Sequence, residues 1–228
     1  VITISSLAIG VQELKKRDID SVVNLYKFAV KTTDSYISKF TERLKQMNLI
    51  DDTYLVICSD HGKQLYERDV FGHTPNFYET NIRVPLLITG PDIKPEKISQ
   101  PISFLDLAPT ILNILKIEQP EGFYGKSFFK NKREYIVCED ARKENNVILA
   151  DILNLKYDLA NQGLAIIEGD YKYIHNRDGK DELFNLKEDH EEKNNIIDSN
   201  KNIAGKMKKL IASHLEFEET KRNETNPP

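Results

Sequence analysis

The chain has 228 residues, of which 39% are hydrophobic and 30% are charged, and its net charge at pH 7 is −4. This composition is typical of a globular protein long enough for one large domain or two small ones. The acidic balance argues against a nucleic-acid-binding surface. No apolar run approaches the ~20 residues that a membrane-spanning helix needs.

The first part of the sequence alternates helical and strand-like patterns. Apolar residues recur at helical spacing from Ile19 to Met47, which predicts one long helix or two helices joined near residues 32–34. An apolar, β-branched run at 53–58 predicts a buried strand. Residues 62–80 lack periodicity, so we expect a long functional loop with a short helix near its end.

A second strand and a second helix follow this loop. Residues 83–91 predict another buried strand closed by a turn, and Ser103 to Leu115 predict a helix with Ser103 as its N-cap. Asp106 lies among apolar residues of this helix, and a buried carboxylate needs partners. Backbone donors of a helical turn would supply them, so we interpret Asp106 as architectural.

After about residue 130 the sequence breaks into short strand-like runs separated by turn dipeptides, which predicts a small antiparallel sheet. The runs are 134–139, 147–152, 163–168, 171–175 and 182–186. Glu168-Gly169-Asp170 is typical of a hairpin turn.

An amphipathic helix is predicted from about 202 to 216, and the polar residues 218–228 predict a disordered tail. We therefore expect three parts: the C-terminal part of an α/β domain over 1–130, a small subdomain over 131–217, and the tail.

The two cysteines, Cys58 and Cys138, are too few for a disulfide framework. Both fall in predicted buried strands, which favours small core residues over a redox pair.

A carboxylate, an imidazole and a glycine follow the first predicted strand directly, at Asp60, His61 and Gly62. In an open α/β sheet, ligands and metals gather beyond the carboxyl ends of the strands. Calcium and magnesium favour oxygen ligands, whereas zinc and manganese accept a mixture of oxygen and nitrogen. A zinc site needs about four ligands and a calcium site about six to eight, so this pair predicts part of a metal site. The alternative is an exposed or hydrogen-bonded loop pair.

His73 lies in the same loop and could donate to an anionic substrate oxygen or protonate a leaving group. The alternative is a loop histidine that is bonded to backbone. Arg68 and Lys63 could steer an anion, although charged loop residues are mostly solvated. The other histidines have no partner at ligand spacing and are interpreted as structural: His175, His190 and His214.

From about residue 20 to residue 216, the ordered motifs resemble the C-terminal half of the sulfatase branch of the alkaline phosphatase superfamily. The motifs are Asp52-Thr53 with Ser59-Asp60-His61-Gly62, Val70-Phe71-Gly72-His73, Phe77-Tyr78-Glu79 with Ile82 to Ile88, Phe104 to Leu112 with Gly125-Lys126-Ser127, Gly169 to Ile174, Glu182 to Leu186 and Glu192 to Asn195.

The resemblance implies an alkaline-phosphatase-like α/β fold. We expect a layered, mainly parallel sheet with helices on both faces and a small C-terminal antiparallel α+β subdomain. It also implies a divalent cation held by four or more protein groups, two of them Asp60 and His61. Calcium is the first candidate, and manganese, magnesium or zinc are alternatives.

The loop carries two candidate substrate-binding residues, one implied by the resemblance and one suggested by its charge alone. His73 falls where the family places a basic residue against the sulfate or phosphate group, which also makes it the candidate catalytic residue. Arg68 is the second candidate. Tyr66 and Arg68 stand where many relatives have Gly and His, so the chain departs from the family pattern there.

The activity implied is hydrolysis of a sulfate or phosphate ester on a small molecule or a glycan, with a sulfate ester as the first candidate. In true sulfatases the nucleophile is a formylglycine made from a Cys/Ser-x-Pro/Ala-x-Arg motif, and this sequence contains no such motif. The family places that nucleophile and the remaining metal ligands in its N-terminal half. We therefore expect a partial catalytic domain that is inactive alone.

Other functions remain open from the sequence. Within the superfamily they are a phosphodiesterase, a phosphonate monoester hydrolase and a phosphoglycerol transferase. A non-catalytic binding or structural module is an alternative of another class. Uncovered apolar strand edges would favour self-association or an ordering partner.

Overall fold

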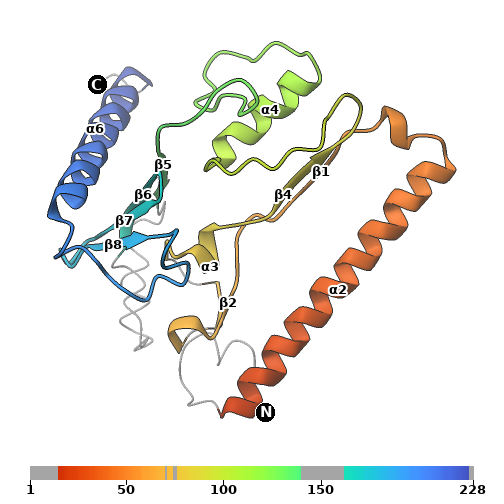
Figure 1. The fold of residues 1–228 in the computed structure, drawn as a ribbon. Helices are drawn as coiled ribbons and strands as arrows, with labels where there is room; N and C mark the ends of the chain where they lie inside the picture. The colour runs from red at the N-terminus through yellow and green to blue at the C-terminus, as the bar shows by residue number, and fades with distance from the viewer. Residues whose placement is uncertain (1–14, 70, 74–75, 140–161, 226–228) are drawn as a thin grey trace. The chain divides into compact units, whose positions relative to one another are not determined.

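The computed structural model describes residues 15–69, 71–73, 76–139 and 162–225 (Figure 1). The described residues divide into two compact units, one up to residue 97 and the other from residue 98 onward. The helix predicted from Ser103 therefore belongs with the C-terminal sheet and not with the first strands. Among the described residues, no helix combines the length and the apolar character needed to cross a membrane.

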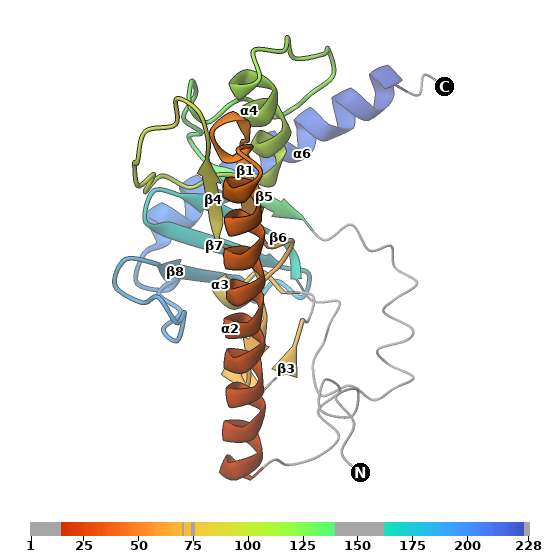
Figure 2. The ribbon, with the colours of Figure 1, turned by 90° about the vertical axis from the view of Figure 1, so that its right-hand side faces the viewer.

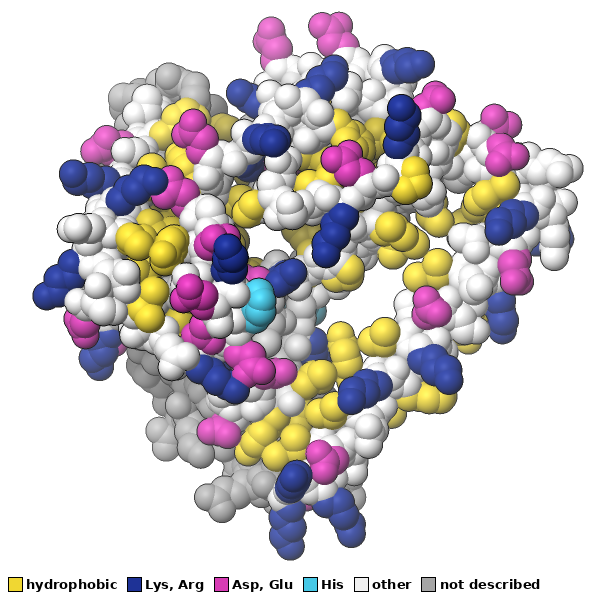
Figure 3. Space-filling view, in the orientation of Figure 1, with side chains coloured by type: hydrophobic (Ala, Val, Ile, Leu, Met, Phe, Trp, Pro, Cys, Tyr) yellow, Lys and Arg dark blue, Asp and Glu magenta, His cyan; other side chains and the backbone are white. Residues whose placement is uncertain are grey.

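The first described element of this unit is a single helix, α2 (Lys16–Gln46), so the one-helix alternative is confirmed. None of the residues of α2, all of which the structure describes, is buried. Leu25, Phe28 and Tyr36 are among its exposed apolar side chains, and Figure 3 shows hydrophobic side chains along this helix. The 3-10 helix η1 (Ile50–Asp52) then leads into the first strand.

The two predicted strands of this unit are confirmed as β1 (Leu55–Cys58) and β4 (Leu86–Thr89). They form an antiparallel pair in which Leu55 lies opposite Thr89 and Cys58 opposite Leu86. The α/β class is correct, but this described pair does not run parallel, as a mainly parallel sheet would require.

The strands of this pair are less buried than the sequence suggests. Cys58 is exposed and Cys138 is only half-buried, so the prediction that both cysteines are core residues is wrong. Within the described residues β1 has β4 as its one hydrogen-bonded neighbour, and its other three residues are half-buried.

The second unit contains the predicted antiparallel sheet, with strand order β5-β6-β7-β8 (Figure 2). Its strands are β5 (Ile136–Glu139), β6 (Gln162–Glu168), β7 (Tyr171–Asn176) and β8 (Glu182–Asn185). The hairpin between β6 and β7 is confirmed, and Gly169 at its turn has a φ of 58°. The predicted run 147–152 lies outside the described residues.

Helix α6 (Lys201–Thr225) covers this sheet with an apolar stripe. Ala204, Met207 and Ile211 pack on strand residues, and the shared core also holds Leu164, Ile166, Tyr173 and Leu183. The helix continues to Thr225, so the prediction of a disordered tail is wrong for residues 218–225. Polarity suggested disorder, but the Glu, Lys and Arg residues of this stretch are good helix formers.

The helix predicted from Ser103 is confirmed as η3 (Phe104–Asp106) followed by α4 (Leu107–Ile114). Ser103 caps it, because its side chain accepts from the Leu105 N–H and the Asp106 carboxylate accepts from the Ser103 N–H. The architectural interpretation of Asp106 agrees with this geometry.

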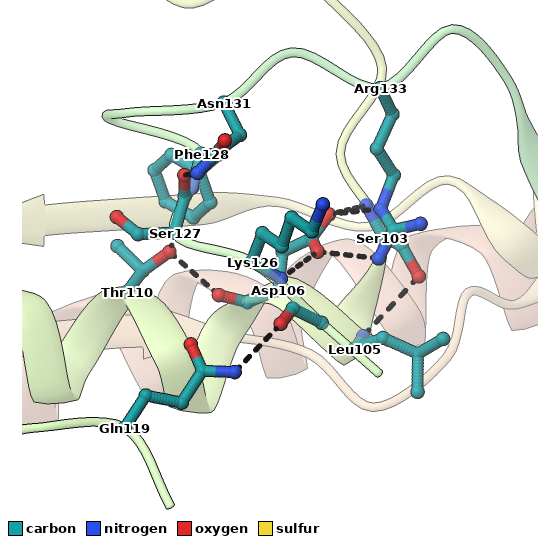
Figure 4. Close-up of polar contacts among 11 residues, drawn as sticks. Ser103, Leu105, Asp106, Thr110, Gln119, Lys126, Ser127, Phe128, Asn131 and Arg133 are labelled. Carbon is teal, nitrogen blue, oxygen red and sulfur yellow. Dashed lines mark hydrogen bonds and ion pairs between the residues drawn. The ribbon is translucent and has the colours of Figure 1, made fainter. Parts of the chain in front are cut away.

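Asp106 also joins this helix to the segment before the sheet (Figure 4). Its carboxylate, 2% exposed, receives both Arg133 Nε at 2.5 Å and an Arg133 terminal nitrogen at 2.6 Å, together with the Lys126 N–H at 2.9 Å. Burial alone would raise the pKa of Asp106, but the hydrogen bonds and charge of Arg133 outweigh it and lower that pKa.

A second buried carboxylate, Asp181, fastens α6 to the sheet. It accepts from the Tyr173 hydroxyl, from Lys208 Nζ at 2.9 Å, from His175 Nδ1 at 3.0 Å and from the Asn176 N–H at 3.0 Å. Burial favours the protonated acid, yet these donors lower the pKa of Asp181, and burial beside this carboxylate raises the pKa of the Tyr173 hydroxyl.

Replacing Arg133 with Ala should lower the free energy of unfolding by about 3 kcal/mol, because it leaves the buried Asp106 carboxylate without its cation. Urea unfolding followed by circular dichroism measures the change. Arg83→Ala is the matched control, since that side chain is 71% exposed and its loss should cost less than about 0.5 kcal/mol. Equal costs for the two variants would contradict the assignment.

The lowered pKa values of Asp106 and Asp181 also predict how stability depends on pH. A carboxyl whose folded-state pKa lies below the ordinary value of 3.8 stabilises the fold above that pH, and this stabilisation is lost as pH falls through the folded-state pKa. Stability should therefore be level near neutral pH and fall below about pH 4. Asp181→Asn should be less stable at pH 7 and show a smaller loss on acidification, measured by thermal unfolding between pH 3 and pH 7.

Candidate active site

The candidate site begins where β1 ends. The turn after Cys58 is fixed by two local hydrogen bonds, from Ser59 Oγ to the His61 carbonyl at 2.7 Å and from the His61 N–H to Asp60 Oδ1 at 3.0 Å. These bonds hold the acidic residue and the histidine together directly beyond the carboxyl end of the strand, as the sequence predicts.

Gly62 lets this turn rest against the short helix α3 (Glu79–Ile82). Its N–H donates to the Asn81 carbonyl at 2.7 Å, and a Cβ atom at this position would lie only 2.1 Å from the Thr80 carbonyl oxygen. Only glycine fits such a close approach of two backbones.

A small hairpin then returns the chain to the turn that follows β1. Strands β2 (Gln64–Leu65) and β3 (Phe71–Gly72) pair in antiparallel register, with Gln64 opposite Gly72. This register brings His73 back beside His61, and the centroids of the two imidazole rings lie 3.9 Å apart.

Buried amides beneath the loop are the supporting residues that the sequence analysis missed. Gln64 is 1% exposed and its Oε1 accepts from Asn76 Nδ2 at 2.9 Å, while Asn81 Nδ2 donates to the Asn76 carbonyl at 3.4 Å. Phe71 and Phe77 are buried around them. The sequence gives no signal that a glutamine in a polar loop is buried.

The side chains of Asp60 and His61 can face one cation. Asp60 Oδ2 lies 3.7 Å from His61 Nε2, and the Asp60 side chain is 86% exposed. His61 Nδ1 lies 2.7 Å from the Gly62 carbonyl, so we assign the ring proton to Nδ1 and the lone pair to Nε2. A backbone carbonyl that fixes the tautomer in this way is the usual support of a metal-binding histidine.

Both atoms therefore fit as ligands of a single divalent ion. Ligand bonds of about 2.0–2.5 Å place two ligands of one ion at most roughly 4–5 Å apart. Within the described residues there is no group of three or more His, Cys, Asp or Glu side chains able to hold a metal. The described residues therefore supply two candidate ligands, fewer than a divalent ion takes.

The other charged and histidine candidates lie as follows. Arg68 lies in the 3-10 turn η2 (Glu67–Asp69), with its guanidinium carbon 3.5 Å from the Tyr78 ring centroid. Lys63 is exposed. The remaining histidines belong to the second unit, where His175 contacts Asp181 and His214 Nε2 lies 2.8 Å from Glu139 Oε1.

Comparison with known proteins identifies the family to which this chain belongs. The sulfatase family matches residues 8–117, and the family described as "N-sulphoglucosamine sulphohydrolase, C-terminal" matches residues 73–219. The chain belongs to the sulfatase family of the alkaline phosphatase superfamily.

Individual relatives agree with this family. Arylsulfatase K of Bos taurus is 26% identical over 208 residues, which cover 89% of this chain and 38% of that protein. The crystal structure of a putative sulfatase from Bacteroides thetaiotaomicron VPI-5482 aligns with a TM-score of 0.73 at 20% identity, over 90% of this chain and 45% of that one, which confirms the α/β fold class.

A protein solved in complex with its substrate D-glucosamine-2-N,6-O-disulfate aligns with a TM-score of 0.62 at 25% identity, over 87% of this chain and 40% of that one. The chain spans less than half the length of these relatives.

Gly62→Ala should displace the turn from α3, because the added methyl group meets the Thr80 carbonyl oxygen. We expect a loss of about 1–3 kcal/mol in the free energy of unfolding and separation of the His61 and His73 rings. Thermal unfolding and the NMR shifts of the two imidazoles measure these effects. Gly205→Ala is the control, since it lies in α6 with open space around it and should be neutral or stabilising.

Proposed function

We propose that this chain forms the cation-binding and leaving-group side of a sulfate-ester hydrolase. The observation that carries the proposal is the arrangement at the end of β1, where Asp60 Oδ2 and His61 Nε2 lie 3.7 Å apart and the His73 ring lies against His61. Membership of the sulfatase family supports the reaction class.

Asp60 and His61 are the proposed metal ligands, with calcium as the first candidate and manganese, magnesium or zinc as alternatives. The exposed carboxylate supplies anionic oxygen, and the Gly62 carbonyl keeps His61 in the tautomer whose Nε2 can bind. A bound cation supplies charge stabilisation to the non-bridging oxygens of the ester.

His73 is proposed to act on the substrate itself. Its ring is exposed, and the register of the β2–β3 hairpin holds it beside the cation ligands. From this position an imidazole can hydrogen-bond to an anionic oxygen or deliver a proton to the leaving oxygen.

The chain is proposed to be inactive by itself, because its sequence contains no Cys/Ser-x-Pro/Ala-x-Arg motif for a formylglycine. The nucleophile and the remaining cation ligands would come from further polypeptide. The exposed apolar side chains of α2 favour an ordering partner or self-association.

The proposed substrate is a sulfate ester carried by a sugar or another small molecule. Support comes from the relative solved with its substrate D-glucosamine-2-N,6-O-disulfate, which is 25% identical to this chain. The exposure of Asp60 and His73 is compatible with a ligand that enters from solvent.

Calcium titration tests the metal site. The chain should bind Ca²⁺ with a Kd weaker than about 1 μM, because two ligands are fewer than the six to eight that calcium takes. Asp60→Asn should abolish this binding in calorimetry, and Asp51→Asn, which removes an exposed carboxylate in η1, should leave it unchanged. Submicromolar binding, or binding unaffected by Asp60→Asn, would contradict the partial site.

Turnover tests the proposed inactivity. The purified chain should not release the phenol from an aryl sulfate above the uncatalysed rate, since no group in its sequence matches the family nucleophile. A turnover that His73→Ala removes would show that this chain holds a complete site and would refute this part of the proposal.

A further inference from the structure

The hairpin register holds His73 from one side. Gly72, directly before it, has a φ of 107°, which glycine adopts readily and other residues do not, and glycine also leaves the chain free to take other conformations. The His73 ring is exposed and lies with its centroid 3.9 Å from that of His61. A single contact between two rings is weak. The position of this imidazole therefore also depends on how the chain is held after His73.

Asn76 holds the chain on that other side. Its Nδ2 donates to Gln64 Oε1 at 2.9 Å, and Gln64 is 1% exposed. Gln64 is also the residue that lies opposite Gly72 in the β2–β3 pair. One buried glutamine thus fixes the segment on both sides of His73, through strand pairing before it and through its side chain after it.

Asn76 is joined to helix α3 as well. Its Oδ1 accepts from the Tyr78 N–H at 3.2 Å, and its carbonyl accepts from Asn81 Nδ2 at 3.4 Å. The Asn81 carbonyl accepts in turn from the N–H of Gly62, the residue after His61, at 2.7 Å. These bonds place the segment that follows one imidazole and the turn that carries the other on the same short helix.

Burial makes the bond between Asn76 and Gln64 selective for one conformation of the segment. A buried amide that loses a hydrogen-bond partner is disfavoured unless water replaces that partner. Gln64 lies beneath the loop and water reaches it poorly, so a conformation in which Asn76 moves away is disfavoured. The segment that carries His73 is closed by this bond.

We propose that Asn76 is a positioning residue that holds the His73 imidazole against His61. The inference rests on the proposed function, in which His73 acts on the sulfate ester beside the cation ligands. In this role Asn76 acts through Gln64 and α3, and it keeps the imidazole where it can reach an oxygen of the bound ester.

NMR of the chain with labelled histidines tests the inference at neutral pH. The ring protons of His61 and His73 should give NOE cross-peaks with each other in the wild-type chain, because the two rings are in contact. Asn76→Ser should remove these cross-peaks, since the shorter side chain cannot reach Gln64. A serine hydroxyl can still accept from the Tyr78 N–H, so the turn before α3 is kept.

Two further variants make the test specific. Gln64→Met retains a long buried side chain but removes the amide acceptor, and it should also abolish the cross-peaks. Asn131→Ser is the matched control, because it removes an amide that donates to the Ser127 carbonyl in the second unit. The cross-peaks should remain in this control.

Calcium binding separates positioning from a general loss of structure. The Asn76→Ser chain should bind Ca²⁺ within about twofold of the wild-type Kd. The reason is that the bonds from Gly62 to Asn81 and from Asn81 to residue 76 are both accepted by backbone carbonyls, which the substitution leaves in place. The amide spectrum of each variant shows whether it is folded.

Cross-peaks that survive Asn76→Ser and Gln64→Met, or that are missing from the wild-type chain, would overturn the inference. Loss of calcium binding together with the cross-peaks, or loss of the folded spectrum in both variants, would also overturn it, because Asn76 would then support the whole loop. Failure of the proposed function gives a different result, namely calcium binding that Asp60→Asn does not change. If Asp60→Asn abolishes calcium binding while Asn76→Ser keeps the cross-peaks, the proposed function stands and the inference falls.

Discussion

The close approach of Gly62 to helix α3 is the contact on which the candidate site depends. It fixes the turn after β1, and through this turn it sets the positions of Asp60 and His61. The same helix begins at Tyr78, the residue on which Arg68 lies. A four-residue helix of low intrinsic stability can do this because backbone hydrogen bonds and buried amides hold it from several sides.

The division of the chain separates the candidate site from the best-packed core. In the second unit the carboxylates of Asp106 and Asp181 are satisfied by several donors and sit beside a well-packed core. The described part of the first unit has small two-stranded sheets, an exposed long helix and the candidate site residues. Within the first unit the candidate residues lie in turns and loops, where functional residues are commonly found.

Local sequence signals were sufficient for much of the fold. The periodicity of α2, the Ser103 cap and the turn at Gly169 each act over a few residues, and the structure has all three. Asp60 and His61 could be identified as candidate metal ligands because they directly follow a predicted strand. Burial was harder to predict, since it depends on neighbouring elements: Cys58 follows an apolar strand pattern and is nevertheless exposed.

The details of the site that the sequence could not supply are all non-local. The contact between the rings of His61 and His73 depends on the register of a two-residue hairpin, and the burial of Gln64 depends on Asn76 and the aromatic residues around it. The left-handed conformations of Tyr66 and Arg68 are disfavoured by their residue types, so no propensity argument would place them there. For residues 218–225 the local signal was misread: their polar composition predicted disorder, although their residue types favour a helix.

The exposure of α2 has a consequence for the rate at which its amide hydrogens exchange with solvent. A helix without buried side chains gains little stability from tertiary packing. Its amide hydrogens are therefore protected from exchange only by the stability of the helix itself. Solvent hydrogen exchange along α2 would then be faster by orders of magnitude than in β6 and β7, whose strands are shielded by α6. A protein surface that docks on α2 would slow this exchange. The exchange rate of α2 would therefore show whether a partner is bound to this helix.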